Sequence, residues 1–210
     1  MEILEKISES LQRGEHEQVA QLTKQAIDAG LSATKILNDG LLPGMAVIGR
    51  RFGAHEIFLP EMLLAARAMN AGIDLLKPLF IAGEMPTQGK VVIGTVKGDL
   101  HDIGKNLVGI MLKGAGFEVV DVGSDVAAEV FVDAAEAEKA SVVGLSALLT
   151  TTMTGMKEVV DLVKARGLQD KVKIIVGGAP LSKAFADEIG ADAYGYDAGN
   201  AVEIVKELIG

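Results

Sequence analysis

The 210-residue sequence contains no cysteine and no tryptophan, and aromatic residues make up only 4% of it. The lack of cysteine excludes disulfides, iron–sulfur clusters and thiolate nucleophiles, so any metal site must use imidazole or oxygen ligands. The scarcity of aromatic side chains disfavours recognition of nucleobases or sugars by stacking. Ligand binding is therefore expected to use the backbone and small residues.

Basic residues and long apolar runs are also scarce. Lys and Arg number 20 against 29 Asp and Glu, which gives a formal net charge of -9. Binding to a phosphate backbone needs clustered Lys and Arg, so no nucleic-acid partner is expected. No apolar run approaches the roughly 18 residues of a membrane span, and the N-terminus shows no signal-peptide core. The sequence thus predicts a cytoplasmic protein without a membrane partner.

The first part of the chain has helical periodicity. From Glu2 to about Ile81 apolar residues recur every three or four positions, which is typical of amphipathic helices. Gly14 and Gly30 are placed as helix C-caps, Ser32 as an N-cap and Pro60 in a first helical turn. We expect a four-helix bundle at residues 1–84. The stretch 83–89, with one proline between two glycines, predicts a linker at 85–89.

The second part, residues 90–210, has a different pattern of short β-branched runs separated by segments of helical length. Nearly continuous apolar strands that alternate with helices predict a doubly wound, Rossmann- or flavodoxin-like α/β domain with a buried parallel sheet. A last helix is expected through Ile204, Val205 and Leu208. The five expected strands are Val91 to Val96, Phe117 to Val122, Ser141 to Leu145, Val172 to Val176 and, more weakly, Ala193 to Tyr196.

Three of these strands are followed by small or polar residues. The motif Asp99-x-His101-x-x-Gly104 follows the first strand, Ser146-x-Leu148 the third, and Gly177-Gly178 the fourth. Open α/β sheets bind ligands outside the carboxyl ends of their strands, so the three motifs are expected to meet at one edge. A histidine placed there is a candidate metal ligand. His16 and His55 have no comparable setting.

The ordered set of motifs resembles the cobalamin-binding domain of methionine synthase and related corrinoid proteins. The helical part is also similar to that family's cap module, through Gly49-Arg50-Arg51-Phe52-Gly53 and Phe58-Leu59-Pro60-Glu61. Together the two resemblances span nearly the whole chain. They imply a cobalamin or related corrinoid as cofactor.

The resemblance implies a role for each residue of the first motif. His101 would replace the corrinoid's own lower base as the axial cobalt ligand, and imidazole suits such a metal. Asp99 would hold the other ring nitrogen of that histidine, with helix N-capping as its structural alternative. Thr152 stands where the family has a serine that completes this hydrogen-bonded relay. The neighbouring candidate cofactor contacts are Gly98, Leu100, Asp102, Ile103 and Gly104.

The later motifs resemble those that line the family's slot for the displaced nucleotide tail. Ser146 would hydrogen-bond the base, Leu148 would pack on it, and Thr150 would contact the tail. Gly177 and Gly178 would let the backbone approach, and Ala198 lies in the last turn. Ordinary turn chemistry and strand packing are the structural alternatives for this group.

On the helical side, Phe52 and Leu59 match cap positions that cover the upper face of the corrin in the family that the sequence resembles, with Met62 nearby. The alternative is that these residues fill the core of the bundle, as apolar residues at helical spacing usually do. Leu59 is the best exception, because a residue before proline is pushed towards an extended conformation.

The resemblance implies a methyl carrier and not a complete enzyme. Its corrinoid would accept a methyl group from a substrate-specific methyltransferase and pass it to a second methyltransferase that uses folate or a thiol, with a reductive activation protein as a further partner. Methanol, methylamines, betaines and methoxylated aromatics are all open as donors. A cobalamin-dependent sensor, an adenosylcobalamin mutase subunit and a flavodoxin-like signalling module remain as alternatives.

Overall fold

The computed structural model describes residues 2–80 and 87–209. Their contacts divide the chain into two compact units, a helical unit in the N-terminal part and an α/β unit after it, and each is considered by itself. The expected linker at 85–89 lies partly outside the described residues, as do residues 83 and 84 before it.

The helical unit consists of amphipathic helices joined by short turns. Gly30 follows the second helix with a φ of 82°, a left-handed conformation that suits a glycine after a helix end. Ser32 caps the next helix, because its hydroxyl accepts a hydrogen bond from the backbone N–H of Lys35. The helices are α1 (Glu2–Gln12), α2 (His16–Asp28), α3 (Ala33–Ile36), α4 (Leu42–Gly53) and α5 (Leu59–Leu76), with a π-helical stretch at Leu37–Leu41 and a 3-10 turn at Lys77–Leu79.

The π-helical stretch joins α3 to α4 without a break, so the unit has the expected four long helices within the described residues. It ends two residues before Pro43, which lacks an N–H and would place its ring against the carbonyl four residues earlier in a regular helix. Widening of the helix by a π-turn at this point avoids that conflict.

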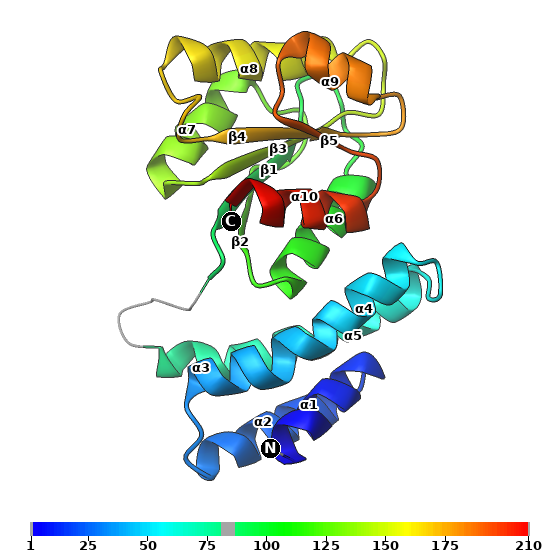
Figure 1. Ribbon diagram of the computed structural model, residues 1–210, viewed down its shortest axis with the longest axis vertical. Helices are drawn as coiled ribbons and strands as arrows, with labels where there is room; N and C mark the ends of the chain where they lie inside the picture. The colour runs from blue at the N-terminus through cyan, green and yellow to red at the C-terminus, as the bar shows by residue number, and fades with distance from the viewer. Residues whose placement is uncertain (1, 81–86, 210) are drawn as a thin grey trace. The chain divides into compact units, whose positions relative to one another are not determined.

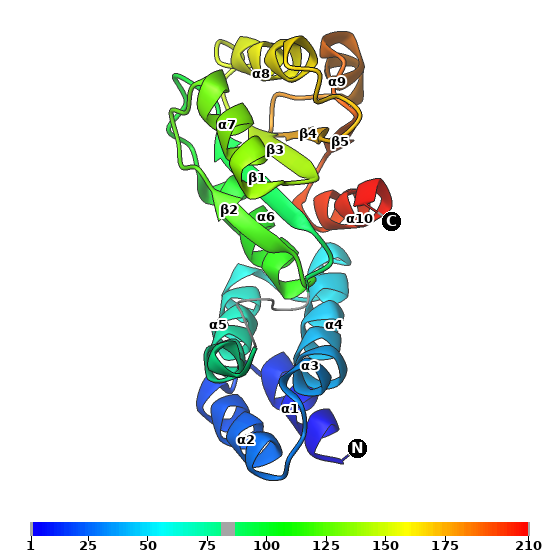
Figure 2. The same ribbon diagram turned by 90° about the vertical axis from the view of Figure 1, so that its left-hand side faces the viewer.

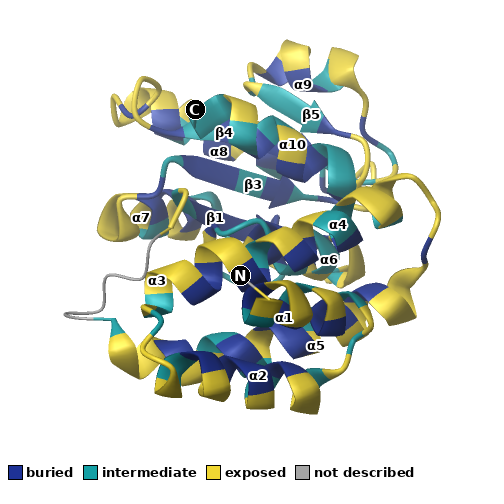
Figure 3. Cartoon of the chain, turned by 60° about the horizontal axis from the view of Figure 1, so that its bottom comes forward, coloured by how far each residue is buried: buried dark blue, intermediate teal, exposed yellow. Residues whose placement is uncertain are grey.

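The bundle buries one stripe of each helix and leaves the other in solvent, as the alternation along α2 and α5 in Figure 3 shows. Gly44 lets α1 and α4 approach closely, since a Cβ there would lie 2.9 Å from the carbonyl oxygen of Ser8. The buried apolar side chains of the unit include Ile7, Leu11, Val19, Leu22, Ile36, Leu41, Ile48, Met62, Met69 and Leu76.

The α/β unit alternates strands with helices along the chain. Its strands are β1 (Lys90–Thr95), β2 (Glu118–Asp121), β3 (Val142–Ser146), β4 (Lys173–Gly177) and β5 (Ala193–Gly195), and each boundary lies within one residue of the expected run. Its helices are α6 (Ile103–Gly114), α7 (Ala128–Glu138), α8 (Thr154–Ala165), α9 (Lys183–Ile189) and α10 (Ala198–Ile209).

The five strands pair in parallel in the order β2-β1-β3-β4-β5. This order is that of flavodoxin-like doubly wound sheets, in which ligands bind at the switch point beside β1 and β3. Helices α7, α8 and α9 cover one face of the sheet, while α6 and α10 lie on the other face (Figures 1 and 2). The sequence-based prediction of the fold class is confirmed.

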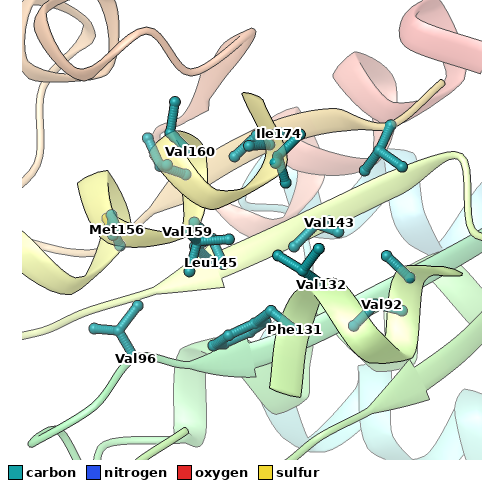
Figure 4. Close-up of a cluster of buried hydrophobic side chains, with 14 of the residues drawn as sticks. Val92, Val96, Phe131, Val132, Val143, Leu145, Met156, Val159, Val160 and Ile174 are labelled. Carbon is teal, nitrogen blue, oxygen red and sulfur yellow. The ribbon is translucent and has the colours of Figure 1, made fainter. Parts of the chain in front are cut away.

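The face covered by α7, α8 and α9 holds a continuous apolar core. Val92, Val143 and Ile174 project from neighbouring strands into it, and Phe131 of α7 is fully buried among them (Figure 4). Burial of such side chains contributes about 1.5–3 kcal/mol each. Packed side chains fill this side of the sheet, so a ligand would have to bind on the opposite face or at the strand ends.

No helix among the described residues is both long and apolar enough to cross a lipid bilayer.

Candidate functional site

The three motifs meet because the strands that carry them end level with one another. Thr95 of β1 pairs with Ser146 of β3, Ser146 pairs with Gly177 of β4, and Gly177 pairs with Gly195 of β5. These four residues form one row across the sheet, on the face of α6 and α10. Laterally paired residues of a sheet share a face, so the row presents two hydroxyls and two glycines to the same space.

The loop after β1 is a tight turn locked by a second loop. Asp99 donates its backbone N–H to the carbonyl of Val96, and Gly98 between them has a φ of 83°, as the third position of a type II turn requires. The Asp125 carboxylate accepts the N–H of Gly98 at 2.8 Å and pairs with the ammonium of Lys97 at 3.0 Å. The backbone around Asp99 is therefore held from two sides.

Asp99 is fully buried and its carboxylate is the centre of the site. Oδ1 accepts hydrogen bonds from the backbone N–H and the ring Nδ1 of His101, at 3.0 and 2.7 Å. Oδ2 accepts from the backbone N–H groups of Leu148 and Leu149, at 2.7 and 3.2 Å, and from the Thr152 hydroxyl at 2.8 Å. Asp99 is not the N-cap of α6, which begins at Ile103.

Burial alone would raise the pKa of the Asp99 carboxyl, but the backbone N–H groups of Leu148 and His101, the His101 ring and the Thr152 hydroxyl together hold its pKa well below its usual range. The carboxylate is thus ionised at neutral pH and can only accept hydrogen bonds. The proton of a neutral His101 ring must then lie on Nδ1, which leaves the Nε2 lone pair free. The His101 side chain is 51% exposed, so a ligand can reach that nitrogen.

Thr152 completes the hydrogen-bonded chain from His101 through Asp99. Thr152 is 8% exposed, and its hydroxyl also lies 2.9 Å from the carbonyl oxygen of Leu149. Its methyl group sits over the turn, 3.4 Å from where a Cβ on Gly98 would be. Threonine at this position therefore keeps the hydrogen bond and adds packing on the glycine.

We expect Thr152→Val to destabilise the protein by about 1–2 kcal/mol, because it removes a hydrogen bond to a buried carboxylate while it keeps the shape of the side chain. Thr152→Ser keeps the hydroxyl and loses only a methyl group, so we expect about 1 kcal/mol or less. Urea unfolding followed by circular dichroism measures both. A valine variant as stable as the serine variant would show that the hydroxyl contributes nothing.

A cavity of about 700 Å³ opens on the sheet face beside this relay, a size typical of ligand pockets. Most of the expected cofactor contacts line it. They are Leu100, His101, Asp102, Ile103, Gly104, Ser146, Leu148, Gly177, Gly178 and Ala198. Asp99 and Thr152 lie behind the lining as supports, and neither Gly98 nor Thr150 belongs to it.

Several lining residues fall outside the motifs. They include Ile93, Lys105, Val108, Gly144, Ile175, Tyr196, Asp197 and Ala201. Gly144 could have been predicted from the sequence, because a glycine inside a central strand often marks a place where a ligand approaches the backbone closely. Lys105 could not have been predicted from the sequence, since only the fold shows that its nearly buried ammonium pairs with Asp121 at the end of β2.

The two glycines after β4 differ in what they require. A Cβ on Gly178 would lie 1.8 Å from the carbonyl oxygen of Ala147, and its φ is 146°. A Cβ on Gly177 would approach only the carbonyl oxygen of Gly195, at 3.2 Å. The glycine at 178 is thus already demanded by the loop after β3, apart from any ligand.

We expect Gly178→Ala to cost about 2–3 kcal/mol of stability, because the left-handed backbone and the clash both oppose a side chain. Gly177→Ala, the matched change at the neighbouring position, should cost about 1 kcal/mol or less, since a contact of that length needs only a small shift. Chemical denaturation of the two variants compares them directly. Equal losses would contradict this distinction.

The residues expected on the cap side differ in exposure. Met62 is fully buried, Phe52 is half-buried and Leu59 is 37% exposed. The extended residue at this turn is Phe58, with a φ of −113° and a ψ of 177°, whereas Leu59 begins α5. The extended conformation expected at Leu59 is thus wrong by one position. His55, after α4, is exposed, and His16, at the start of α2, is half-buried.

The donor set fits a cobalt ion held in a macrocycle. Across residues 2–80 and 87–209, no three His, Asp or Glu side chains gather as ligands for a free metal ion. Beside the cavity a single imidazole presents a free nitrogen, with a carboxylate behind it. A metal bound there would need its remaining ligands from outside the protein, which an organic ring can supply, and the neighbouring cavity can hold the rest of such a molecule. The fold and the site therefore define a corrinoid-binding protein.

Comparison with known proteins agrees with this class. Residues 89–205 match the family described as "B12 binding domain", and residues 3–77 match a second family with the same description. A corrinoid protein of Desulfitobacterium hafniense is 40% identical over 213 residues, covering 100% of this chain and 99% of the relative. A dimethylamine corrinoid protein of Methanosarcina barkeri is 43% identical over 209 residues, covering 99% and 98%.

A solved structure shows the same likeness. A chain in the methanol:cobalamin methyltransferase complex of Methanosarcina barkeri has a TM-score of 0.92 and 35% identity, covering 99% of this chain and 80% of that one. The protein described here belongs to the B12-binding family of corrinoid proteins of methyltransferase systems, and its cofactor is a cobalamin or related corrinoid.

Proposed function

We propose that this protein is the methyl carrier of a multi-component methyltransferase, with His101 as the lower axial ligand of its corrinoid. The observation that carries the proposal is the buried Asp99 carboxylate, which hydrogen-bonds Nδ1 of His101 at 2.7 Å and directs the free Nε2 outwards. When bound, the corrinoid would supply a cobalt centre able to accept a methyl group and to release it to a second nucleophile. The chemistry is the cofactor's, and the chain supplies binding and orientation.

The relay behind His101 sets the basicity and direction of the ring. An ionised carboxylate on the second nitrogen fixes the tautomer and raises the donor strength of the first, as carboxylate partners of metal-bound histidines do. Thr152 and the two backbone N–H groups after β3 hold that carboxylate in place. Proton uptake or release in this chain of groups would tune how strongly Nε2 of His101 can bind a metal.

The cavity on the sheet face would receive the nucleotide tail of the corrinoid. Ser146 offers a hydroxyl to the base, while Leu148 and Ala198 line the cavity and offer apolar packing surface. Gly177 would let the backbone come close, and Thr150, an exposed residue outside the cavity lining, would contact the tail. Gly98, Leu100, Asp102, Ile103 and Gly104 complete the contacts proposed around His101.

The partners proposed are a substrate-specific methyltransferase, a second methyltransferase that uses folate or a thiol, and a reductive activation protein. The proposal of a substrate-specific methyltransferase is supported by two similar proteins, one named as a dimethylamine corrinoid protein and one from a methanol:cobalamin methyltransferase complex. Both classes of donor are therefore proposed. We further propose residues 1–84 as the cap module and residues 85–89 as the linker. Phe52 and Leu59 would be the cap's contacts to the cofactor, and Met62, which is fully buried, would support them from the core of the unit.

Methyl transfer from a labelled donor tests the carrier role. The corrinoid-loaded, reduced protein is mixed with a purified methanol or methylamine methyltransferase and its ¹³C-labelled substrate, and label on the protein is followed by mass spectrometry. We expect label with one donor class, and at least about 100-fold less label when His101→Ala replaces the wild type. Absence of labelling with every methanol and methylamine system would contradict the proposed donors.

A further inference from the structure

The deep part of the cavity in the α/β unit is made by a glycine between two isoleucines. Ile93 of β1 pairs with Gly144 of β3, which pairs with Ile175 of β4, so the three residues lie side by side on one face. A Cβ on Gly144 would lie 3.2 Å from Cγ2 of Ile93 and 3.7 Å from Cγ2 of Ile175. The space between the two isoleucine side chains exists because position 144 has none.

The walls around this floor are also apolar. Val108 of α6 and Ala201 of α10 line the cavity, together with Ala198 at the start of α10. The ammonium of Lys105, which also lines it, already pairs with the carboxylate of Asp121 and with Oδ1 of Asn106 at 2.8 Å. A ligand that enters this part meets hydrocarbon and satisfied polar groups.

One hydroxyl on the same face is open to the cavity. Ser146 lies two residues after Gly144 on β3, so its side chain is on the same face and closer to the carboxyl edge. The residue is half-buried and lines the cavity, and its hydroxyl makes no hydrogen bond to another of the residues that the structure describes. The remaining polar side chains of the lining, those of His101, Asp102, Tyr196 and Asp197, belong to the loops after the strands.

We propose that this cavity selects the lower base of the corrinoid by its polarity, and that it prefers a benzimidazole to a purine. The proposal rests on the proposed function, in which the cavity receives the nucleotide tail. A 5,6-dimethylbenzimidazole base has one free ring nitrogen, which the single Ser146 hydroxyl can satisfy, and its other edge is hydrocarbon. Adenine adds an exocyclic amine and further ring nitrogens, for which the floor and walls offer no free side-chain partner.

A buried polar group without a partner weakens binding on the order of 10- to 100-fold. We therefore expect the full-length protein to bind cobalamin about 10- to 100-fold more tightly than the adeninyl cobamide that differs only in its lower base. Cobinamide, which has no nucleotide tail, is the reference for the contacts outside the cavity. Titration of the protein with each corrinoid, followed by its visible spectrum, gives the three dissociation constants.

The outcomes separate the two proposals. Equal or tighter binding of the adeninyl cobamide overturns the selectivity but leaves corrinoid binding intact. If none of the three corrinoids binds, the proposed function itself fails. A ratio of 10 or more in favour of cobalamin, with tighter binding of cobalamin than of cobinamide, supports the selection by the cavity.

A matched pair of variants tests whether polarity or shape sets the ratio. Ile175→Thr and Ile175→Val have nearly the same volume, but only threonine places a hydroxyl beside Gly144. We expect the valine variant to keep the preference for cobalamin and the threonine variant to reduce it several-fold. Equal ratios in the two variants would overturn polarity as the cause. Thermal unfolding of both variants without a corrinoid establishes that each is folded.

Discussion

Replacement of His101 by alanine is expected to change the visible spectrum of the corrinoid-loaded protein and to lower methyl transfer by at least about 100-fold. Loss of an outer partner of a metal ligand already costs about 10–100-fold, and this change removes the ligand itself. His101 is one loop residue of the cavity lining, and the strands and helices that form the rest of the cavity are unaltered, so the variant should still take up a corrinoid. The spectrum of the loaded variant should then lack the signature of axial imidazole.

His16→Ala is the matched control, because it removes a half-buried histidine from α2 of the helical unit. Its spectrum and methyl transfer should equal those of the wild type. Identical spectra for the His101→Ala variant and the wild type would remove His101 as the ligand. Added imidazole should restore part of the wild-type spectrum to the His101→Ala variant, which no general loss of structure would allow.

Replacement of Asp99 by asparagine is expected to cost about 3–5 kcal/mol of stability, because an amide nitrogen would face several of the N–H and O–H donors that now share the carboxylate. Each buried donor left without an acceptor costs about 1–3 kcal/mol. The same change removes the charge behind His101, so the variant should also bind corrinoid about 10–100-fold more weakly. Denaturant unfolding and a corrinoid titration measure the two effects.

Asp125→Asn is the control for this change. Asp125 belongs to the loop that holds the Asp99 turn, but its side chain is 43% exposed, and an amide oxygen can still accept the N–H of Gly98. Its left-handed backbone, with a φ of 57°, also suits asparagine. We expect a loss within about 0.5 kcal/mol. A loss of stability as large as that of Asp99→Asn would mean that the charge of Asp99 contributes no more to stability than that of Asp125.

The loss of folding stability at acid pH should depend on Asp99. Its pKa in the folded protein lies below the value near 3.9 of an unfolded chain, so its contribution is complete above about pH 5 and is lost as the pH falls below about 4. Between pH 5 and pH 8 this residue should cause no change in stability.

The alternation of strands and helices was readable from the sequence, because buried parallel strands are continuously apolar and helices are not. The level ends of β1, β3 and β4 followed from the same pattern, which is why Asp99, His101 and Ser146 were expected at one edge. The relay partner Thr152 was found through resemblance alone. Periodicity carries no information about which hydroxyl reaches a carboxylate 53 residues earlier in the chain.

Other parts of the site were not predictable, for physical reasons. The N–H groups of Leu148 and Leu149 bind Asp99 through the backbone, and a side-chain motif cannot reveal such donors. The pairing of Lys105 with Asp121 depends on the packing of α6 beside the end of β2. The extended residue at the start of α5 is Phe58 because proline tolerates the second helical position, so the helix could begin one residue earlier than expected.

The register of the strands limits how this protein can change over evolution, because it aligns one row of residues across the sheet: Thr95, Ser146, Gly177 and Gly195. Side chains alternate along a strand, so one residue inserted into β3 would turn Ser146 to the opposite face and shift the row by a full step. Substitutions leave the row in place, whereas a single insertion or deletion within β1, β3 or β4 dismantles it. Variation in length among viable descendants should therefore fall in the connections between elements, while these three strands keep their register.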